Sequence, residues 1–281
     1  EFFQQGAIRF LPHNVYANMP LGAEMHTLAM MTIAQEPDAW FPGLMGKSIL
    51  ASMTVWGAAL LGAFVARRFG MNAGWSAAGI WLATPGIAQS AMLGLVDGVV
   101  ATYVLAAAVA VAYAFEATGA LRMQPAAHAV PLRSSALSWW WLAGVLSGAA
   151  AATKYPGLLF AVVPVCVSLP LAFRLLLFTR RFGQRGDRSA LVRSIALVTI
   201  GLAGTCGTWY AKNWALAGNP VYPLAANIFG GRTLSPAKMA QWQRAHRVPL
   251  SSAPGADAAE RLLRGAQVAA GALREAGIGC A

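Results

Sequence analysis

The chain has 281 residues, of which 57% are hydrophobic and 11% are charged, and its net charge is +11. An average soluble domain carries about 25% charged residues, so this composition indicates a membrane protein and excludes an ordinary water-soluble domain. The basic residues cluster at the ends of apolar stretches, where they orient membrane spans. No nucleic-acid partner is therefore predicted.

A polar segment, residues 1–43, opens the chain. It contains a short apolar stretch at 25–34, which is too short to cross a bilayer, because a span needs about 20 apolar residues. Trp40 and Phe41 follow this stretch and are side chains that favour the headgroup region. We therefore expect residues 1–43 to form an outer loop that includes a helix lying in the membrane interface.

Long apolar stretches, each bounded by charged or helix-breaking residues, dominate the next part of the chain. Only helices or closed barrels satisfy their backbone amides inside hydrocarbon, so we interpret these stretches as transmembrane helices. They lie at 44–66, 75–95, 96–115, 137–152, 158–178 and 190–211. The last segment, 212–281, lacks such runs and contains a predicted amphipathic helix at 256–275.

The predicted fold class is therefore all-α. It is a polytopic membrane helix bundle of about six transmembrane helices over 44–211, preceded by the outer loop with its interfacial helix. A helical extramembrane segment over 212–281 completes the predicted organisation.

Lysine and arginine predict the orientation of the bundle, because cytoplasmic loops are enriched in them. The connections after alternate spans hold Arg67, Arg68, Arg122, Arg133, Arg174, Arg180, Arg181, Arg185, Arg188 and Arg193. The opposite ends hold only Lys47, Lys154 and Lys212, with Asp38 and Asp97, and are expected outside. Six spans then place both termini outside, so we expect a further span before Glu1 and interpret the chain as an internal fragment of a longer protein.

Aromatic and small residues add two expectations about the span at 137–152. Trp139, Trp140 and Trp141 open it on the cytoplasmic side, and tryptophan concentrates at headgroup depth, so we expect them to anchor the helix in the membrane. Gly144 and Gly148 have the spacing that allows another helix to pack closely.

Segments on the predicted outer side carry a family resemblance. They are FLPHNVYANMPLGAEM at 10–25, TKYPGL at 153–158 and WYAKNWALAGNPVYP at 209–223. Together they resemble bacterial multi-span glycosyltransferases of the GT-C superfamily that are similar to the dolichyl-phosphate-mannose protein mannosyltransferases of glycosyltransferase family 39. The resemblance covers residues 1 to about 232 in the right order, and its motifs are diffuse rather than a strict signature.

This resemblance implies sugar transfer on the outer side of a bacterial inner (plasma) membrane. The donor would be a sugar on a polyprenyl phosphate or pyrophosphate, and the acceptor a lipid, glycan or protein. The family's catalytic base is an acidic residue of the first outer loop that would lie upstream of Glu1, so the fragment alone is expected to be inactive. The donor sugar, the acceptor, the oligomeric state and assistance by a divalent metal stay open, and no Cys or His spacing matches a zinc site.

The substrate-binding candidates begin with Asp97 and Lys154, which the sequence places at the outer membrane boundary. A carboxylate there is either functional or a cap of the following helix. Lys154 either contacts the lipid phosphate, which a cation would stabilise as a leaving group, or extends to the interface. Lys212 has the same two interpretations.

The first outer loop supplies the remaining candidates. Its hydrogen-bonding side chains suit sugar hydroxyls, or they merely shape an ordered loop. They are Arg9, His13, Asn14, Tyr16 and Asn18.

Two other classes of protein stay open. A transporter or flippase of a lipid-linked or polar substrate would often show paired halves with broken helices, but the sequence shows no internal repeat. A non-catalytic membrane scaffold would leave the polar first loop without a purpose.

Overall fold

The computed structural model describes residues 2–11, 13–35, 40–118, 135–179, 186–232 and 235–246. Helices make up 83% of these residues, and no strand occurs among them. The chain divides into two compact units, Glu1–Arg232 and Thr233–Ala281. In the second unit the structure describes one helix, α11 (Pro236–His246), and the predicted helix at 256–275 lies outside the described residues.

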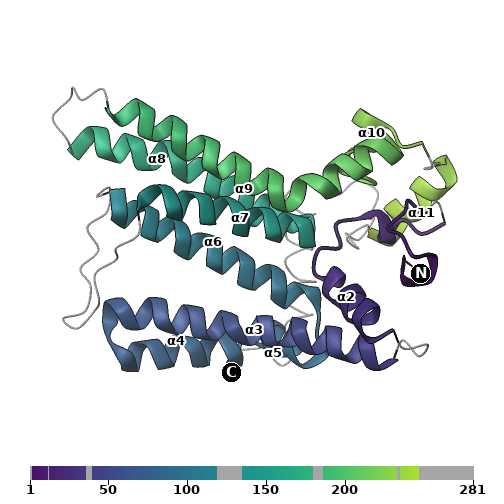
Figure 1. Cartoon of the computed structure of the whole chain (residues 1–281), viewed down its shortest axis with the longest axis horizontal. Helices are drawn as coiled ribbons and strands as arrows, with labels where there is room; N and C mark the ends of the chain where they lie inside the picture. Colours follow the sequence, from purple (N-terminus) through teal and green to yellow (C-terminus); the bar gives the residue numbers. More distant parts are fainter. Residues whose placement is uncertain are drawn as a thin grey trace, which may run out of the picture. The chain divides into compact units, whose positions relative to one another are not determined.

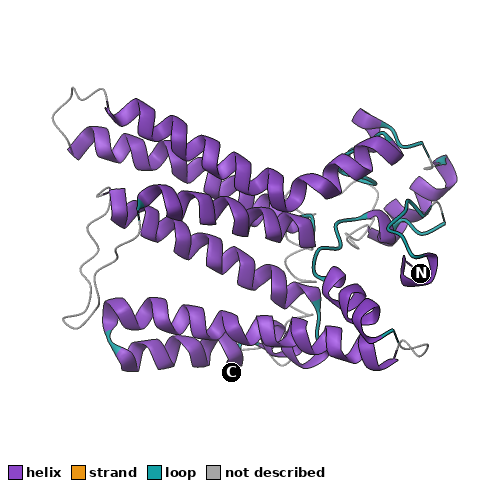
Figure 2. Ribbon diagram, in the orientation of Figure 1, coloured by secondary structure: helices purple, strands orange, loops and turns teal. Residues whose placement is uncertain are grey.

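The first unit is a bundle of helices that lie alongside one another (Figures 1 and 2). Helix α3 packs against α2, α4, α5 and α6, α6 packs against α7, and α7 packs against α9. The elements are α1 (Phe2–Gln5), the 3-10 helix η1 (Tyr16–Asn18), α2 (Glu24–Ala34), α3 (Trp40–Phe69), α4 (Met71–Ala83), α5 (Pro85–Leu93), α6 (Val96–Thr118), α7 (Ala136–Thr153), the π-helix η2 (Leu158–Val162), α8 (Val163–Thr179), α9 (Gly186–Ala217) and α10 (Ala226–Phe229).

Within the described residues, three helices are long and apolar enough to cross a membrane: α3, α6 and the part of α9 from Ser189 to Ala217. They coincide with three of the predicted spans, so the helical class is confirmed for the described residues, and three of the predicted spans are helices of sufficient length and apolarity to cross a membrane. Helices α7 and α8 are shorter. The total of six spans, the boundary at 212 and the interfacial position of α2 stay predictions.

The bundle exposes large apolar side chains along its helices. Trp56 on α3 is 69% exposed, Val167 on α8 is 60% exposed and Ile200 on α9 is 60% exposed. A water-soluble monomer rarely presents large continuous apolar patches. Such a surface is typical of helices that face lipid or a further apolar partner.

The stretch at 75–95 is not one continuous helix. Helix α4 ends at Ala83, Thr84 adopts an extended conformation, and α5 begins with Pro85 at its first position. Proline cannot donate an amide hydrogen bond and disfavours a helical conformation of the residue before it. The break therefore follows from Pro85. The prediction of a single span considered the length of the apolar stretch and not this proline.

The larger apolar core joins α6, α7, α8 and α9 around Trp140, which is completely buried. The prediction that Trp140 anchors the helix at headgroup depth is therefore wrong, because this side chain packs between helices instead. Trp141 is 46% exposed, and its anchoring role stays a prediction. A smaller core of Ala23, Leu50 and Val99 joins α2, α3 and α6.

Small residues bring α7 and α9 into close contact. A Cβ atom added at Gly144 would lie 2.5 Å from the Val198 carbonyl oxygen, and one added at Gly201 would lie 2.7 Å from the Val145 amide nitrogen. Glycine at these positions therefore allows the two backbones to approach, as the small-residue spacing predicts for Gly144 and Gly148.

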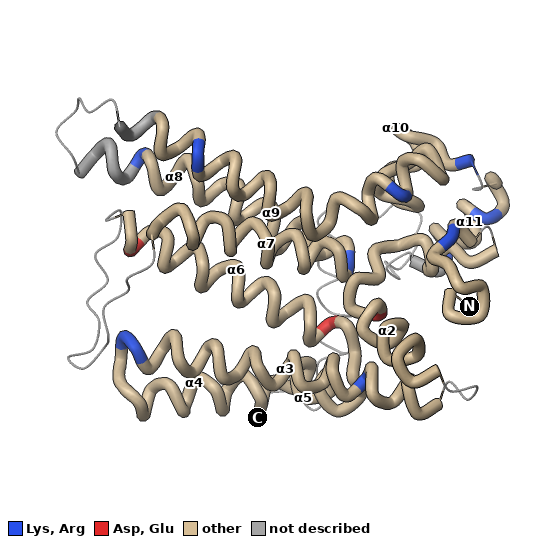
Figure 3. The backbone as a smooth tube through the Cα atoms, in the orientation of Figure 1, with Lys and Arg blue, Asp and Glu red and all other residues tan. Residues whose placement is uncertain are grey.

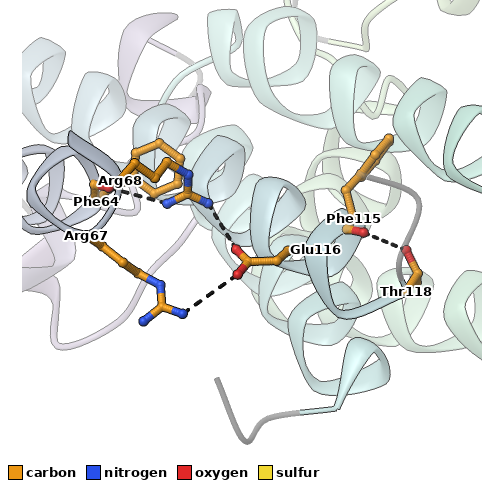
Figure 4. Close-up of polar contacts among 6 residues, drawn as sticks. All are labelled: Phe64, Arg67, Arg68, Phe115, Glu116 and Thr118. Carbon is orange, nitrogen blue, oxygen red and sulfur yellow. Dashed lines mark hydrogen bonds and ion pairs between the residues drawn. The ribbon is translucent and has the colours of Figure 1, made fainter. Parts of the chain in front are cut away.

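One end of the bundle, which we call the Arg68 end, is fixed by a charge cluster between the last turns of α3 and α6 (Figure 4). Arg68 Nη2 lies 3.2 Å from Glu116 Oε2, and Arg67 Nη2 lies 3.7 Å from the other carboxylate oxygen. The Arg68 guanidinium also stacks 3.9 Å from the centre of the Phe64 ring. The long helices carry their charges toward their ends, as Figure 3 shows.

Candidate functional site

The opposite end of the bundle, the Lys154 end, brings together charged side chains from three elements. Asp97 lies in the first turn of α6, and Lys154 follows the last residue of α7. Their side chains form an ion pair with 2.7 Å between Lys154 Nζ and Asp97 Oδ1. The pair remains accessible, with 44% of the Lys154 side chain and 58% of the Asp97 side chain exposed.

Glu24 is the third charged residue at this end, and the sequence analysis missed it. It lies in the first turn of α2, and its Oε2 atom is buried without a hydrogen-bond partner in the described part of the chain. Burial raises the pKa of Glu24 above its usual 4.5, the positive charge of Lys154 partly lowers it, and the negative charge of Asp97 raises it further. The three groups therefore interact electrostatically.

A close backbone contact brings Glu24 to this place. The Gly22 amide donates a hydrogen bond to the Ala152 carbonyl, with 2.8 Å between the two atoms. A Cβ atom at Gly22 would lie only 2.9 Å from the same oxygen, so a side chain would prevent this contact. Gly22 thus docks the first loop on the end of α7, two residues before Glu24. The position of Glu24 in the segment at 10–25 was a signal that could have identified it.

The loop candidates divide into buried and exposed side chains. Asn18 is completely buried, its amide donates to the carbonyls of Leu11 and Asn14, and its oxygen accepts from the Leu11 amide. The Asn14 oxygen accepts from the Ala17 amide. The polar atoms of Asn18 therefore stabilise the loop, which is the structural alternative for this residue.

Arg9, His13 and Tyr16 are exposed on the same loop. The structure does not bring them into contact with the ion pair of Asp97 and Lys154 in any of the described interactions. Their role as sugar contacts stays a prediction.

The last candidate, Lys212, lies near the end of α9. Its Nζ atom is buried, has no hydrogen-bond partner in the described residues, and lies 4.3 Å from the centre of the Trp209 ring. The next residue, Asn213, is 1% exposed, and neither of its amide atoms has a hydrogen-bond partner among those residues. Asn213 was not among the predicted site residues, although it lies in the segment at 209–223.

The end of α7 and the loop after it contact the part of α9 around Lys212. The Tyr155 hydroxyl donates to the Tyr222 carbonyl, and the Tyr210 hydroxyl donates to the Ala151 carbonyl at 3.0 Å. Burial raises the pKa of Tyr155 well above its usual value, and its interaction with Asn213 offsets a small part of that increase. Tyr155 therefore lies close to Asn213.

The described residues contain no group of three or more His, Cys, Asp or Glu side chains that could hold a metal ion. The Lys154 end instead combines the Lys154 ammonium group with the Glu24 and Asp97 carboxyl groups, and the segment of α9 that carries Lys212 lies nearby. Such a set can bind an anionic or polyhydroxylated group while the adjoining helices contact hydrocarbon.

The fold and this polar end together define a class: an all-helical membrane protein with charged groups gathered at the ends of its helices. Comparisons with protein-family models, with curated proteins and with solved structures found no significant match.

Proposed function

We propose that the chain is part of an integral-membrane glycosyltransferase that moves a sugar from a polyprenyl-phosphate-linked donor to a lipid, glycan or protein acceptor. The observation that carries the proposal is the meeting of Glu24, Asp97 and Lys154 at one end of an apolar bundle. A lipid-linked sugar also has a polar and an apolar part. Its polyprenyl tail requires hydrocarbon, and its phosphate and sugar require charged and hydrogen-bonding groups.

In this proposal six spans cross a bacterial inner membrane, with α4 and α5 forming one broken span. The Lys154 end faces the periplasm or exterior, and the Arg68 end faces the cytoplasm, in agreement with the preference of basic residues for the cytoplasmic side. The lipid phosphate lies among the lysines of the Lys154 end, and exposed polar side chains of the first loop face the sugar.

The ion pair has a defined part in this mechanism. Asp97 holds the Lys154 ammonium at the start of α6, so that its charge is positioned before substrate binds. As the bond between the sugar and the phosphate breaks, negative charge grows on the phosphate oxygen. A nearby, positioned cation stabilises that charge.

The test is glycosyl transfer from a panel of polyprenyl-phosphate sugars by the full-length protein in membranes, comparing wild type with Asp97→Asn and Lys154→Ala. We expect donor turnover to be lost in both variants, while a substitution at the exposed Phe69, next to Arg68 at the opposite end of the bundle, leaves it unchanged. Absence of turnover with every donor in folded wild-type protein would reject the proposal.

The break between α4 and α5 favours transport as the second candidate function. Broken helices often form the substrate site of transporters, and the extended Thr84 interrupts an otherwise apolar stretch. Flux of a lipid-linked or polar substrate into liposomes that contain the protein, without release of sugar from a donor, would establish transport instead of transfer.

A further inference from the structure

The two lysines near this end of the bundle differ in their surroundings. Lys154 is exposed and neutralised by Asp97. Lys212 has a buried ammonium group for which the described part of the chain provides no carboxylate and no hydrogen-bond acceptor. The Trp209 ring, 4.3 Å away, attracts the cation but accepts no conventional hydrogen bond. A buried charge without a partner is unfavourable, so this lysine requires an anion that the described chain does not provide.

Asn213 gives a second, independent observation of the same kind. It is 1% exposed, and neither atom of its amide makes a hydrogen bond of normal geometry with the described residues, although the side chain lies close enough to the Tyr155 hydroxyl to offset part of the rise in the pKa of Tyr155. Most buried polar groups in native proteins have a partner, and an exception points to a bound molecule or ion. By contrast, buried Asn219 and Asn18 have their amides satisfied.

The geometry of α9 joins these observations. Trp209, Lys212 and Asn213 are related by three and four positions, so they occupy neighbouring places on one side of the helix. Lys212 and Asn213 lie near the end of a helix long enough to cross a membrane, Ser189–Ala217. A group bound there would lie close to headgroup depth, where a lipid carries its phosphate.

We propose that Lys212 and Asn213 bind the phosphate group of a membrane lipid, with the Trp209 ring placed beneath the ammonium. A phosphate oxygen accepts a charge-assisted hydrogen bond from Lys212 and a further hydrogen bond from the Asn213 amide nitrogen. The identification of the lipid as the sugar donor rests on the proposed function; the phosphate site itself does not. In the proposed reaction Lys212 and Asn213 then hold the phosphate of the bound lipid, while Lys154, positioned by Asp97, stabilises the charge that grows on the phosphate during transfer.

The test measures lipid binding by native mass spectrometry on the full chain in a maltoside detergent, which contains no phosphate. The probes are undecaprenyl phosphate, phosphatidylglycerol and inorganic phosphate. We expect Lys212→Gln and Asn213→Leu to weaken binding of the lipid phosphate at least tenfold. The matched control Lys47→Gln, which removes an exposed lysine of α3, should change it less than threefold.

The preference among the probes distinguishes the sources of the phosphate. Stronger binding of undecaprenyl phosphate identifies the donor, and equal binding of phosphatidylglycerol identifies a phospholipid headgroup; both require dependence on Lys212. Unchanged lipid binding in Lys212→Gln, or a greater loss in Lys47→Gln, would overturn the proposal.

Thermal stability without lipid gives a readout that does not depend on recovering lipid during purification. Lys212→Gln removes a buried charge for which the described residues offer no partner. The melting temperature of the lipid-free variant should therefore equal or exceed that of wild type, while the stabilisation by added lipid disappears. A strongly lowered melting temperature without lipid would show that Lys212 already pairs with a carboxylate of the chain, and would reject the site.

The outcomes for the site and for the proposed function are separable. Lipid binding that depends on Lys212, without sugar transfer from any donor, rejects the transferase and retains the site. Sugar transfer that is insensitive to Lys212→Gln and Asn213→Leu retains the transferase and rejects the identification of the bound lipid as the sugar donor.

Discussion

The close packing of α7 against α9 can be tested with two glycines of α9 that lie three positions apart. A Cβ atom at Gly201 would meet the Val145 nitrogen at 2.7 Å, the Gly144 carbonyl carbon at 2.9 Å and the Trp141 oxygen at 3.0 Å. All three are backbone atoms of α7, so no side-chain rotation can relieve the contact. A Cβ atom at Gly204 would meet nothing within 4 Å.

The expected magnitude follows from these distances. Ordinary contact begins at 3.4 Å, so 3.4 minus 2.7 leaves about 0.7 Å by which Gly201→Ala must move the backbones apart. Overpacking of this kind costs about 1–3 kcal/mol. Both substitutions gain the same helix propensity, about 1 kcal/mol, which cancels in the comparison. Gly204→Ala should therefore be about 1–3 kcal/mol more stable than Gly201→Ala.

The assay is reversible unfolding by sodium dodecyl sulfate in maltoside micelles, followed by the loss of helical circular dichroism. Wild type, Gly201→Ala and Gly204→Ala are compared at the same detergent composition. Equal free energies of unfolding for the two variants would refute the close approach of α7 and α9. A lower stability of Gly204→Ala would refute it as well.

Two further predictions concern charged groups at opposite ends of the bundle. Glu116→Gln removes the carboxylate beside Arg68, whose side chain is 7% exposed, and should lower the free energy of unfolding by about 1–3 kcal/mol in the same assay. This is less than the roughly 3–5 kcal/mol for a fully buried pair, because Glu116 is 19% exposed; no loss would contradict a stabilising role of the pair. Burial raises the pKa of Glu24 above 4.5, so the folded state binds the proton of this carboxyl group more tightly than the unfolded state does. The stabilisation that results is fully present below pH 4.5 and is lost as the pH rises through the pKa of Glu24 in the folded state. Relative to Glu24→Gln, the melting temperature of wild type should fall as the pH is raised through this range, and parallel pH profiles would show that Glu24 has no shifted pKa.

The all-helical fold class could be predicted from the sequence because the formation of apolar helices depends on local composition. The apolar stretches at 44–66, 96–115 and 190–211 predicted α3, α6 and α9, since any long apolar segment without proline or glycine clusters must form a helix in hydrocarbon. The prediction of one continuous helix at 75–95 was wrong at Pro85. The proline was a local signal for a break, but the prediction relied on the length of the apolar stretch. The anchoring role predicted for Trp140 was wrong, because an amphipathic tryptophan side chain suits a helix interface as well as the headgroup layer.

The site was only partly accessible for a different reason. Asp97 and Lys154 were predicted singly at the same membrane boundary, but their ion pair joins residues 57 positions apart. Glu24 acquires its surroundings from the docking of Gly22 on Ala152, a contact between distant segments. No pattern along the chain indicates which of two boundary lysines is neutralised.

The sequence by itself thus determined that the chain forms apolar helices and that its few charges lie near the ends of those helices. Both properties follow from the free-energy cost of placing charges and unpaired backbone amides in hydrocarbon. This cost applies to each residue separately and can therefore be judged from the sequence. Only the tertiary structure decided that Lys154 is paired with Asp97, while the described part of the chain gives the buried Lys212 ammonium no hydrogen-bond acceptor. Pairing and burial depend on which helices meet, and that is fixed by packing between segments far apart in the chain.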